Sequence, residues 1–234
     1  MKRRQRNRER AVAGVACLVL VALGVSLLPL WRDSDVAHAR DIVKWAYYVG
    51  NDPTSRTSLE QNIEQIDVVS PYFYHLTPNG SIKSFVQPDV TAFVKSRGKK
   101  IVPLIQNEAR WDEFTKQIDT AEERDAIVAK LVEVVATNGY DGIHIDFEGL
   151  NQTDREALTD FMRRLNLSFK PRGWLVSQAV IARTSDAPST WGGVYDYKAL
   201  AAVNDYVAIM AYDWGYAGRP DPAPVAPIWW VRDV

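Results

Sequence analysis

The chain has 234 residues, of which 47% are hydrophobic and 24% are charged, and its formal net charge is -1. These values are typical of a globular protein with a substantial core, so they exclude a low-complexity chain. Six basic residues and one acidic residue give the first ten positions a charge of +5 and leave -6 for the remainder. The mildly acidic body gives no support to nucleic-acid binding, and no nucleic acid is expected as a partner.

Residues 1–40 are predicted to be a leader, and residues 41–234 a single domain. The uncharged stretch 11–31 follows the basic start and is about long enough to span a bilayer, so we expect an anchor in a bacterial membrane. Ala37-His38-Ala39 leaves cleavage by signal peptidase as the alternative. Either outcome predicts an extracytoplasmic domain, membrane-anchored or secreted. The single cysteine, Cys17, allows no disulfide framework.

Apolar runs and helical periodicity alternate regularly after the leader. Strands are predicted at 42–49, 67–74, 100–105, 143–148 after a turn at 139–142, 174–179 and 206–213, and helices at 55–66, 89–96, 121–137, 154–167, 195–203 and from 226 onward. This order predicts an α/β fold of the TIM-type (β/α)8 barrel, with about six units present and strands seven and eight missing. A doubly wound open sheet is the alternative, but no glycine-rich nucleotide-binding loop follows any strand.

The fourth predicted strand carries the clearest chemical pattern. Side chains alternate between the two faces of a strand, which places His144, Asp146 and Glu148 on one face and isoleucine and phenylalanine side chains on the other. If Asp146 is ionised, a nearby Glu148 holds its proton more tightly and fits the role of general acid. The alternative is a solvated acidic rim, which the strict alternation and the preceding glycine turn disfavour.

The segment Asp141-Gly142-Ile143-His144-Ile145-Asp146-Phe147-Glu148 resembles the Asp-x-x-Asp-x-Asp-x-Glu motif of glycoside hydrolase family 18, the chitinases and their relatives. It differs at His144, where chitinases have aspartate. A neutral residue at this position, and the sequences of the second and third predicted strands, resemble the spore-cortex and cell-wall N-acetylglucosaminidase subgroup more than the chitinases. The resemblance implies that this segment is strand four of a TIM barrel.

The segment Met210-Ala211-Tyr212-Asp213 resembles the Met-x-Tyr-Asp motif on strand six of the same family. The resemblance implies that Tyr212 steadies the N-acetyl group of the substrate and that Asp213 binds sugar or orients its neighbours. A tyrosine packed in the core is the alternative reading of Tyr212. The further residues predicted to bind substrate are Gln106, Asn107, Tyr72, Tyr74, Met210 and Trp214, and His144, Asp141 and Asp213 are predicted to support the catalytic residues.

The family resemblance implies a retaining, substrate-assisted hydrolysis of β-linked N-acetylglucosamine polymers such as peptidoglycan or chitin. Glu148 would be the general acid and base, Asp146 would hold the amide nitrogen and Tyr212 the acetyl oxygen. No cofactor and no metal are expected, and a metal-binding His-x-Asp-x-Glu strand is the weaker alternative. A neutral His144 could orient Asp146, whereas a protonated one would lower the pKa of both carboxyls.

A non-catalytic, lectin-like remnant of the same barrel is the alternative function. Such proteins usually lose the catalytic glutamate, whereas Glu148 is present here. The expected partner is an N-acetylglucosamine polysaccharide, and a monomer is expected.

Overall fold

Strands and helices alternate along the part of the chain that the computed structural model describes, which is residues 42–185, 192–215 and 221–234. The strands are β1 (Trp45–Tyr48), β2 (Val68–Leu76), β3 (Ile82–Ser84), β4 (Lys100–Ile101), β5 (Leu104–Asn107), β6 (Gly142–Asp146), β7 (Leu175–Ile181) and β8 (Tyr206–Met210). The helices are α2 (Pro53–Asn62), α3 (Pro88–Ser96), α4 (Asp112–Ile118), α5 (Ala121–Asn138), α6 (Arg155–Phe169), α7 (Tyr197–Val203) and α8 (Ile228–Asp233), with short 3-10 turns at Ile63–Gln65, Gln152–Asp154 and Lys170–Arg172.

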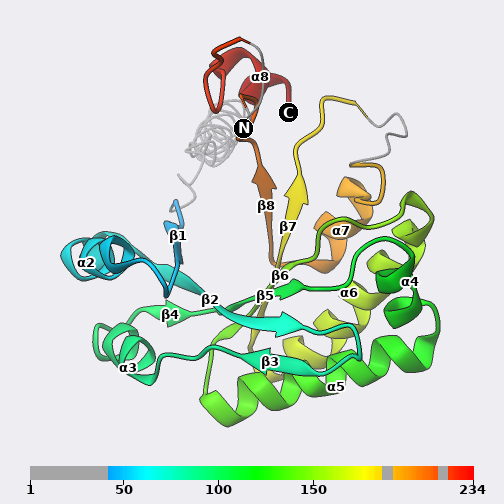
Figure 1. Ribbon diagram of the computed structural model, residues 1–234. Helices are drawn as coiled ribbons and strands as arrows, with labels where there is room; N and C mark the ends of the chain where they lie inside the picture. The colour runs from blue at the N-terminus through cyan, green and yellow to red at the C-terminus, as the bar shows by residue number, and fades with distance from the viewer. Residues whose placement is uncertain (1–41, 186–191, 216–220) are drawn as a thin grey trace, which may run out of the picture. The chain divides into compact units, whose positions relative to one another are not determined.

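The sheet runs in the order β1-β2-β5-β6-β7-β8, and each neighbouring pair on this path is parallel (Figure 1). β3 forms an antiparallel hairpin with β2, and β4 is a short parallel extension beside β2. Trp45 of β1 and Tyr206 of β8 bring their ring centroids within 5.5 Å of each other, so the inner side of the sheet is curved. These strands form an incomplete barrel, which confirms the predicted fold class.

The leader predicted for residues 1–40, including the stretch 11–31, lies outside the described residues. Within the described ranges, no helix is long and apolar enough to cross a membrane. The expectation of a transmembrane helix is corrected by this finding, because none of the described helices could serve as one.

The outer face of β6 packs against helices because its alternate side chains are apolar. Ile143, Ile145 and Phe147 are fully buried, and the Phe147 ring stacks on Phe161 of α6 at a centroid distance of 5.7 Å. The same alternation turns His144 and Asp146 toward the inner face, where the neighbouring strand β5 supplies Leu104 and Gln106 at the same levels. The carboxyl end of β6 therefore opens among polar groups from adjacent strands.

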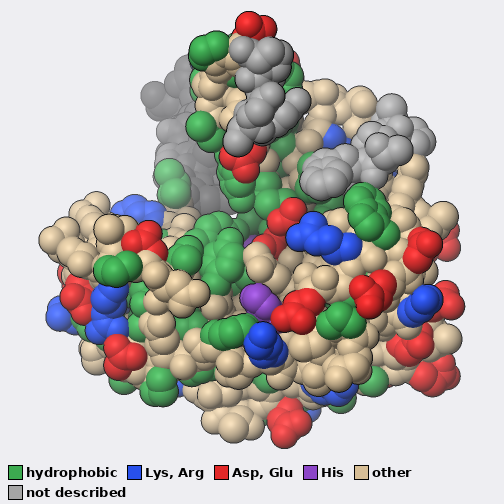
Figure 2. Space-filling view, in the orientation of Figure 1, with side chains coloured by type: hydrophobic (Ala, Val, Ile, Leu, Met, Phe, Trp, Pro, Cys, Tyr) green, Lys and Arg blue, Asp and Glu red, His purple; other side chains and the backbone are tan. Residues whose placement is uncertain are grey.

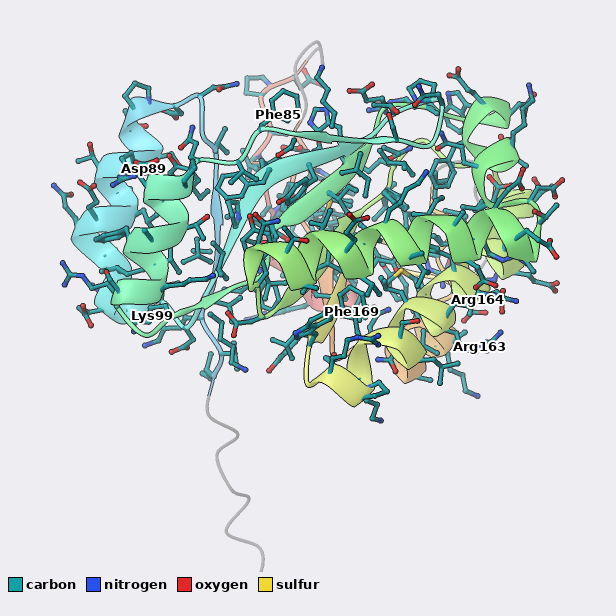
Figure 3. All side chains as sticks on the ribbon, turned by 90° about the horizontal axis from the view of Figure 1, so that it is seen from below. Phe85, Asp89, Lys99, Arg163, Arg164 and Phe169 are labelled. Atoms are coloured by element: carbon teal, nitrogen blue, oxygen red, sulfur yellow. The ribbon has the colours of Figure 1, made fainter. Side chains whose placement is uncertain are left out.

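Two helices hold this outer layer together. Figure 3, seen from below, shows α5 running alongside α6, which carries the labelled Arg163 and Arg164. Arg164 donates to both carboxylate oxygens of Asp125 on α5 at 2.8 Å. A capping box between Thr120 and Glu123 starts α5, as the sequence pattern at its amino end requires.

Three local features differ from the predicted elements. The third predicted strand is divided into β4 and β5 at Val102-Pro103, because Pro103 has no N–H to donate to a neighbouring strand. The β3 strand and the helix α4 were not predicted, since both are short. The other predicted strands and helices are present with boundaries shifted by a few residues.

Candidate active site

Asp146 ends β6 on the inner side of the sheet, and only 5% of its surface is exposed. Gln106 of β5 donates its amide N–H to Asp146 Oδ2 at 3.2 Å. The other carboxylate oxygen, Oδ1, is buried and has no hydrogen-bond partner among the described residues. Burial raises the pKa of Asp146, and the Gln106 hydrogen bond partly opposes that rise. An unpaired buried oxygen of this kind can accept a hydrogen bond from a ligand.

Glu148 lies two residues beyond Asp146, and its backbone is fixed by Asn107. The Asn107 Oδ1 atom accepts from the Glu148 N–H, and Asn107 Nδ2 donates to the Glu148 carbonyl, both at 2.8 Å. Burial raises the pKa of the Glu148 carboxyl first, and the charges of Asp146 and Asp213 raise it further. Arg110 lowers it in part. A carboxyl whose pKa is raised keeps a proton that it can donate at a higher pH.

His144 lies fully buried beneath the carboxylates on the same face of β6. Its Nε2 atom is 3.1 Å from the hydroxyl of Tyr47, and its Nδ1 atom is 2.9 Å from the hydroxyl of Ser177. Burial lowers the pKa of His144 to about 4. The imidazole is therefore neutral near pH 7, and the network consists of neutral hydrogen bonds below an acidic pair.

Three tyrosines surround the two carboxylates. The rings of Tyr47 on β1 and Tyr72 on β2 are 6.1 Å apart in a T-shaped contact. Tyr212 follows β8 and is 47% exposed. Burial raises the pKa of each of the three phenols, and the charge of Asp146 raises it further in every case, so all three hydroxyls are within electrostatic reach of that carboxylate. The phenols are thus neutral donors and acceptors around the acids.

The arrangement does not resemble a metal centre in the part of the chain that the structure describes. Both ring nitrogens of His144 already have hydroxyl partners. Among the described residues, no group of three His, Cys, Asp or Glu side chains is placed to hold a metal ion.

The model of the family "Glycosyl hydrolases family 18" matches residues 44–233. The chain belongs to glycosyl hydrolase family 18. The match covers every described strand of this family 18 domain and includes the segment that carries Asp146 and Glu148. The resemblance inferred from the two sequence motifs is confirmed.

Relatives of the family 18 domain include bacterial lytic enzymes and chitinases. The cortical fragment-lytic enzyme of Bacillus subtilis (strain 168) is 30% identical over 212 residues, which are 85% of this chain and 48% of that protein. The crystal structure of a chitinase from Chromobacterium violaceum superposes with a TM-score of 0.74 at 26% identity, covering 82% of this chain and 62% of that one. The spore cortex-lytic enzyme SleL of Bacillus cereus shares the fold, with a TM-score of 0.76 at 22% identity over 82% of this chain and 46% of that one. The chain spans about half the length of the curated relatives that it matches.

The family 18 domain brings most of the predicted site residues together. His144 and Asp146 of β6 lie level with Leu104 and Gln106 of β5, and Tyr72 of β2 lies level with Leu104 on its other side. Glu148 follows two residues after Asp146, where β6 has ended. Tyr212 and Asp213 follow β8, and Asp213 adopts a left-handed backbone with φ of 62°. Met210 is the last residue of β8, opposite Ile181 of β7.

Four predicted site residues have other positions or contacts. A bulge between Tyr72 and Tyr74 reverses the side on which Tyr74 lies, and its hydroxyl contacts that of Tyr140 at 3.1 Å in the buried layer. Asp141 lies at the opposite, amino end of β6, where its carboxylate accepts from the Ile101 N–H at 2.8 Å. Tyr74 therefore lies in the buried layer, contrary to its predicted role in binding substrate, and Asp141 lies apart from Asp146 and Glu148, which it was predicted to support.

Asn107 is 7% exposed, and its amide is used on the backbone carbonyls of Ala109 and Glu148 and on the Glu148 N–H. It therefore positions Glu148 and has little capacity left for a sugar, contrary to the prediction. Trp214 packs its ring on Trp229 and Trp230 of α8, with centroid distances of 5.0 and 5.3 Å. The structure places Trp214 in this aromatic cluster, which the sequence did not predict.

Sequence reasoning missed four residues of this site. Tyr47 and Ser177 hold His144, and Tyr195 donates its hydroxyl to the Phe147 carbonyl at 2.6 Å, between the two acids in sequence. The charge of Arg110 lowers the pKa of Glu148. The alternation of Trp45 and Tyr47 along β1 could have indicated Tyr47, because both would face inward. Nothing in the sequence indicates the level at which Ser177 pairs with His144.

Proposed function

We propose that this family 18 domain hydrolyses β-linked N-acetylglucosamine polymers, with bacterial cell-wall glycan as the favoured substrate and chitin as the second. The observation that carries the proposal is the placement of a buried Asp146, with one unpartnered carboxylate oxygen among the described residues, two positions before a Glu148 whose backbone is held by Asn107, where the parallel strand β6 ends. Such a mouth is where enzymes with this architecture place their catalytic groups. The name of the Bacillus subtilis relative, a cortical fragment-lytic enzyme, supports the choice of wall glycan.

The proposed reaction is retaining and assisted by the substrate. Glu148 donates its proton to the glycosidic oxygen while the carbonyl oxygen of the sugar's own N-acetyl group attacks the anomeric carbon. The bond to the leaving sugar breaks, and a cyclic oxazolinium ion forms. Glu148, now a carboxylate, removes a proton from water as the water opens this ring, so both groups return to their starting states.

Asp146 and Tyr212 have the properties that the acetamido group requires. The unpartnered Asp146 Oδ1 can accept the acetamido N–H, and its charge stabilises the positive charge that develops on the ring. The Tyr212 phenol is neutral because burial and nearby carboxylates raise its pKa, so it can donate to the acetyl oxygen. Gln106 orients Asp146 by its hydrogen bond.

The surrounding residues are assigned lesser roles in the proposal. Neutral His144, held by Tyr47 and Ser177, supports the inner face without adding a charge. Tyr72, Met210 and Asp213 line the sugar-binding rim. An extracytoplasmic location and action as a monomer complete the proposal, because the substrate lies outside the cytoplasm and one chain supplies all of these residues.

The test is cleavage of defined oligomers by the purified protein. N-acetylglucosamine oligomers and peptidoglycan are incubated with the wild type, with Glu148→Gln, and with Glu156→Gln as a matched control on the exposed face of α6. We expect cleavage by the wild type and by the Glu156 variant, and a loss of at least about a hundredfold in kcat for Glu148→Gln. Binding without cleavage by all three proteins would instead favour the lectin-like alternative.

A further inference from the structure

Arg110 lies beside the acidic pair and has no side-chain partner in the part of the chain that the structure describes. Its guanidinium has no hydrogen bond and no ion pair within 4.0 Å among the described residues. Most other described arginines are paired with carboxylates: Arg56, Arg97, Arg124, Arg155, Arg163 and Arg164. An unpaired guanidinium retains five N–H donors for another group.

The backbone holds Arg110 in a defined place next to Glu148. A methyl group placed on Gly149, the residue after Glu148, would come within 3.1–3.2 Å of Arg110 Cδ, Cγ and Nη1. The neighbouring Trp111 N–H donates to the Gly149 carbonyl at 2.7 Å, with a φ of 52° at Trp111. The side chain of Arg110 thus lies along the turn that follows the catalytic glutamate, and its exposed end faces solvent.

The charges near Arg110 limit what its partner can be. Burial and the charges of Asp146 and Asp213 raise the pKa of Glu148, and the charge of Arg110 lowers it. Figure 2 shows acidic and basic side chains interspersed on the visible face, without an extended basic surface. A small free anion would be repelled by the acids, whereas an anion attached to a bound sugar is held there by the contacts of the sugar.

We propose that Arg110 selects glycans that carry a carboxylate on the sugar next to the scissile bond. A planar guanidinium matches a carboxylate through two parallel hydrogen bonds, which a point charge such as lysine cannot reproduce. The amino sugar that fits is N-acetylmuramic acid, whose 3-O-lactyl group bears a carboxylate, whereas chitin is neutral. This inference rests on the proposed function and specifies its substrate class.

The carboxylate has two possible sources in a wall glycan. It belongs to the lactyl group itself in a glycan without peptide, and to the stem peptide where that peptide is joined to the lactyl group through an amide. Three glycans separate these sources. The lactyl methyl ester of the peptide-free glycan lacks the charge, the peptide-free glycan carries it on the lactyl group, and the peptide-bearing glycan carries it on the peptide.

The experiment compares kcat/KM on peptide-free glycan, its methyl ester, peptide-bearing glycan and neutral chitin oligomers. The variants are Arg110→Gln, Arg110→Lys and, as a control, Arg172→Gln, whose guanidinium lies over Trp174 at 5.6 Å. We expect Arg110→Gln to lower the ratio of carboxylate glycan to ester about tenfold, as the loss of a charge-assisted pair does. Arg110→Lys is expected to retain only part of the ratio, and Arg172→Gln all of it. A preference for the peptide-bearing glycan would assign the carboxylate to the peptide.

Both the carboxylate glycan and its methyl ester are cleaved with Glu148 as the general acid. The ratio of their kcat/KM values therefore reports recognition of the carboxylate and cancels any effect of Arg110 on the pKa of Glu148. Equal ratios in the wild type and Arg110→Gln, with chitin still cleaved, would overturn this inference and leave the proposed function intact. Binding of the same glycans to Glu148→Gln, with and without Arg110→Gln, gives a second readout that needs no cleavage. No binding and no cleavage of any glycan would overturn both.

Discussion

Burial favours the uncharged form of an ionisable side chain, so it lowers the pKa of a histidine and raises the pKa of a carboxyl. It lowers the pKa of His144 to about 4, and it raises the pKa of Asp146 and Glu148. The result is an imidazole that is neutral near pH 7 below two carboxyls whose pKa values are raised. Burial alone lowers the pKa of His144, whereas the charges of Asp146 and Asp213 add to the effect of burial on Glu148.

His144 gives the folded protein a dependence on pH that can be measured. Its pKa is about 4 when folded and 6.5 in the unfolded reference, so protons bind preferentially to the unfolded chain. Its contribution to stability is complete above pH 6.5 and is lost as the pH falls from 6.5 toward 4, by up to about 3 kcal/mol.

We expect His144→Asn to remove this loss. Chemical denaturation of both proteins between pH 7 and pH 4.5 should show the wild-type free energy of unfolding falling relative to that of the variant. Subtracting the free energy of unfolding of the variant from that of the wild type at each pH cancels the contributions of Asp146 and Glu148, whose raised pKa values favour the folded state as the pH falls. A gap between the two proteins that stays constant with pH would contradict the neutral, buried state of His144.

Charges next to Glu148 should shift the basic limb of activity in opposite directions. Asp213 raises the pKa of Glu148, so Asp213→Asn is expected to move the loss of activity to lower pH. Arg110 lowers the same pKa, so Arg110→Gln is expected to move that loss to higher pH. Profiles of kcat/KM against pH on neutral chitin oligomers test both, since that substrate adds no charge. Shifts in the same direction for both variants would exclude Glu148 as the group that titrates.

At the scale of single elements, Gly142 allows β6 and β7 to approach closely. A methyl group at this position would lie 2.1 Å from the Leu175 carbonyl oxygen and 2.8 Å from Leu175 N, both backbone atoms of β7. Backbone atoms cannot move aside as a flexible side chain can, so the strands would have to separate. That separation would break the pairing that places Ser177 next to His144.

We therefore expect Gly142→Ala to lower the free energy of unfolding by about 3 kcal/mol or more. The control is Gly98→Ala, because Gly98 has a φ of 65° but no atom within 4 Å of an added methyl group. Its cost should be about 1–2 kcal/mol, from the left-handed backbone alone. Urea denaturation of the two variants measures the difference, and equal costs would contradict the close approach of β6 and β7.

Strand periodicity explains why so much of the fold and of the acidic face could be predicted. The pairing of β6 with β5 has no register shift, and it puts His144 and Asp146 level with Leu104 and Gln106, two positions apart, as strand alternation predicts; Glu148 lies beyond the strand, and its facing stays a prediction. On β2 a bulge adds a residue between Tyr72 and Tyr74 and reverses the alternation, so Tyr74 was placed on the wrong side. Contacts such as Tyr47 with His144, 97 positions apart, depend on the pairing of separate strands, which a sequence pattern does not specify.

At the scale of the whole domain, the proposed site is assembled from the ends of strands that are far apart in sequence. Tyr47 comes from β1, Tyr72 from β2, Gln106 from β5, Asp146 from β6 and Tyr212 from the segment after β8. Each strand is held mainly by its immediate neighbours through the parallel ladder. A sugar chain that contacts several of these ends at once would connect strands that the ladder links only in series.

Binding of a substrate oligomer should therefore stabilise the folded domain as a unit. In the Glu148→Gln protein, which is expected not to consume the ligand, N-acetylglucosamine oligomers at a hundred times their Kd should add about 2.7 kcal/mol and raise Tm by about 5–10 °C. Glucose oligomers of the same length lack the acetamido group that Asp146 and Tyr212 are proposed to hold, so they should leave Tm nearly unchanged. Combining Glu148→Gln with Tyr212→Ala should reduce the shift, because the acetyl oxygen loses its donor while the strands remain intact. Equal shifts with both kinds of oligomer would show that the acetamido group is not what the site recognises.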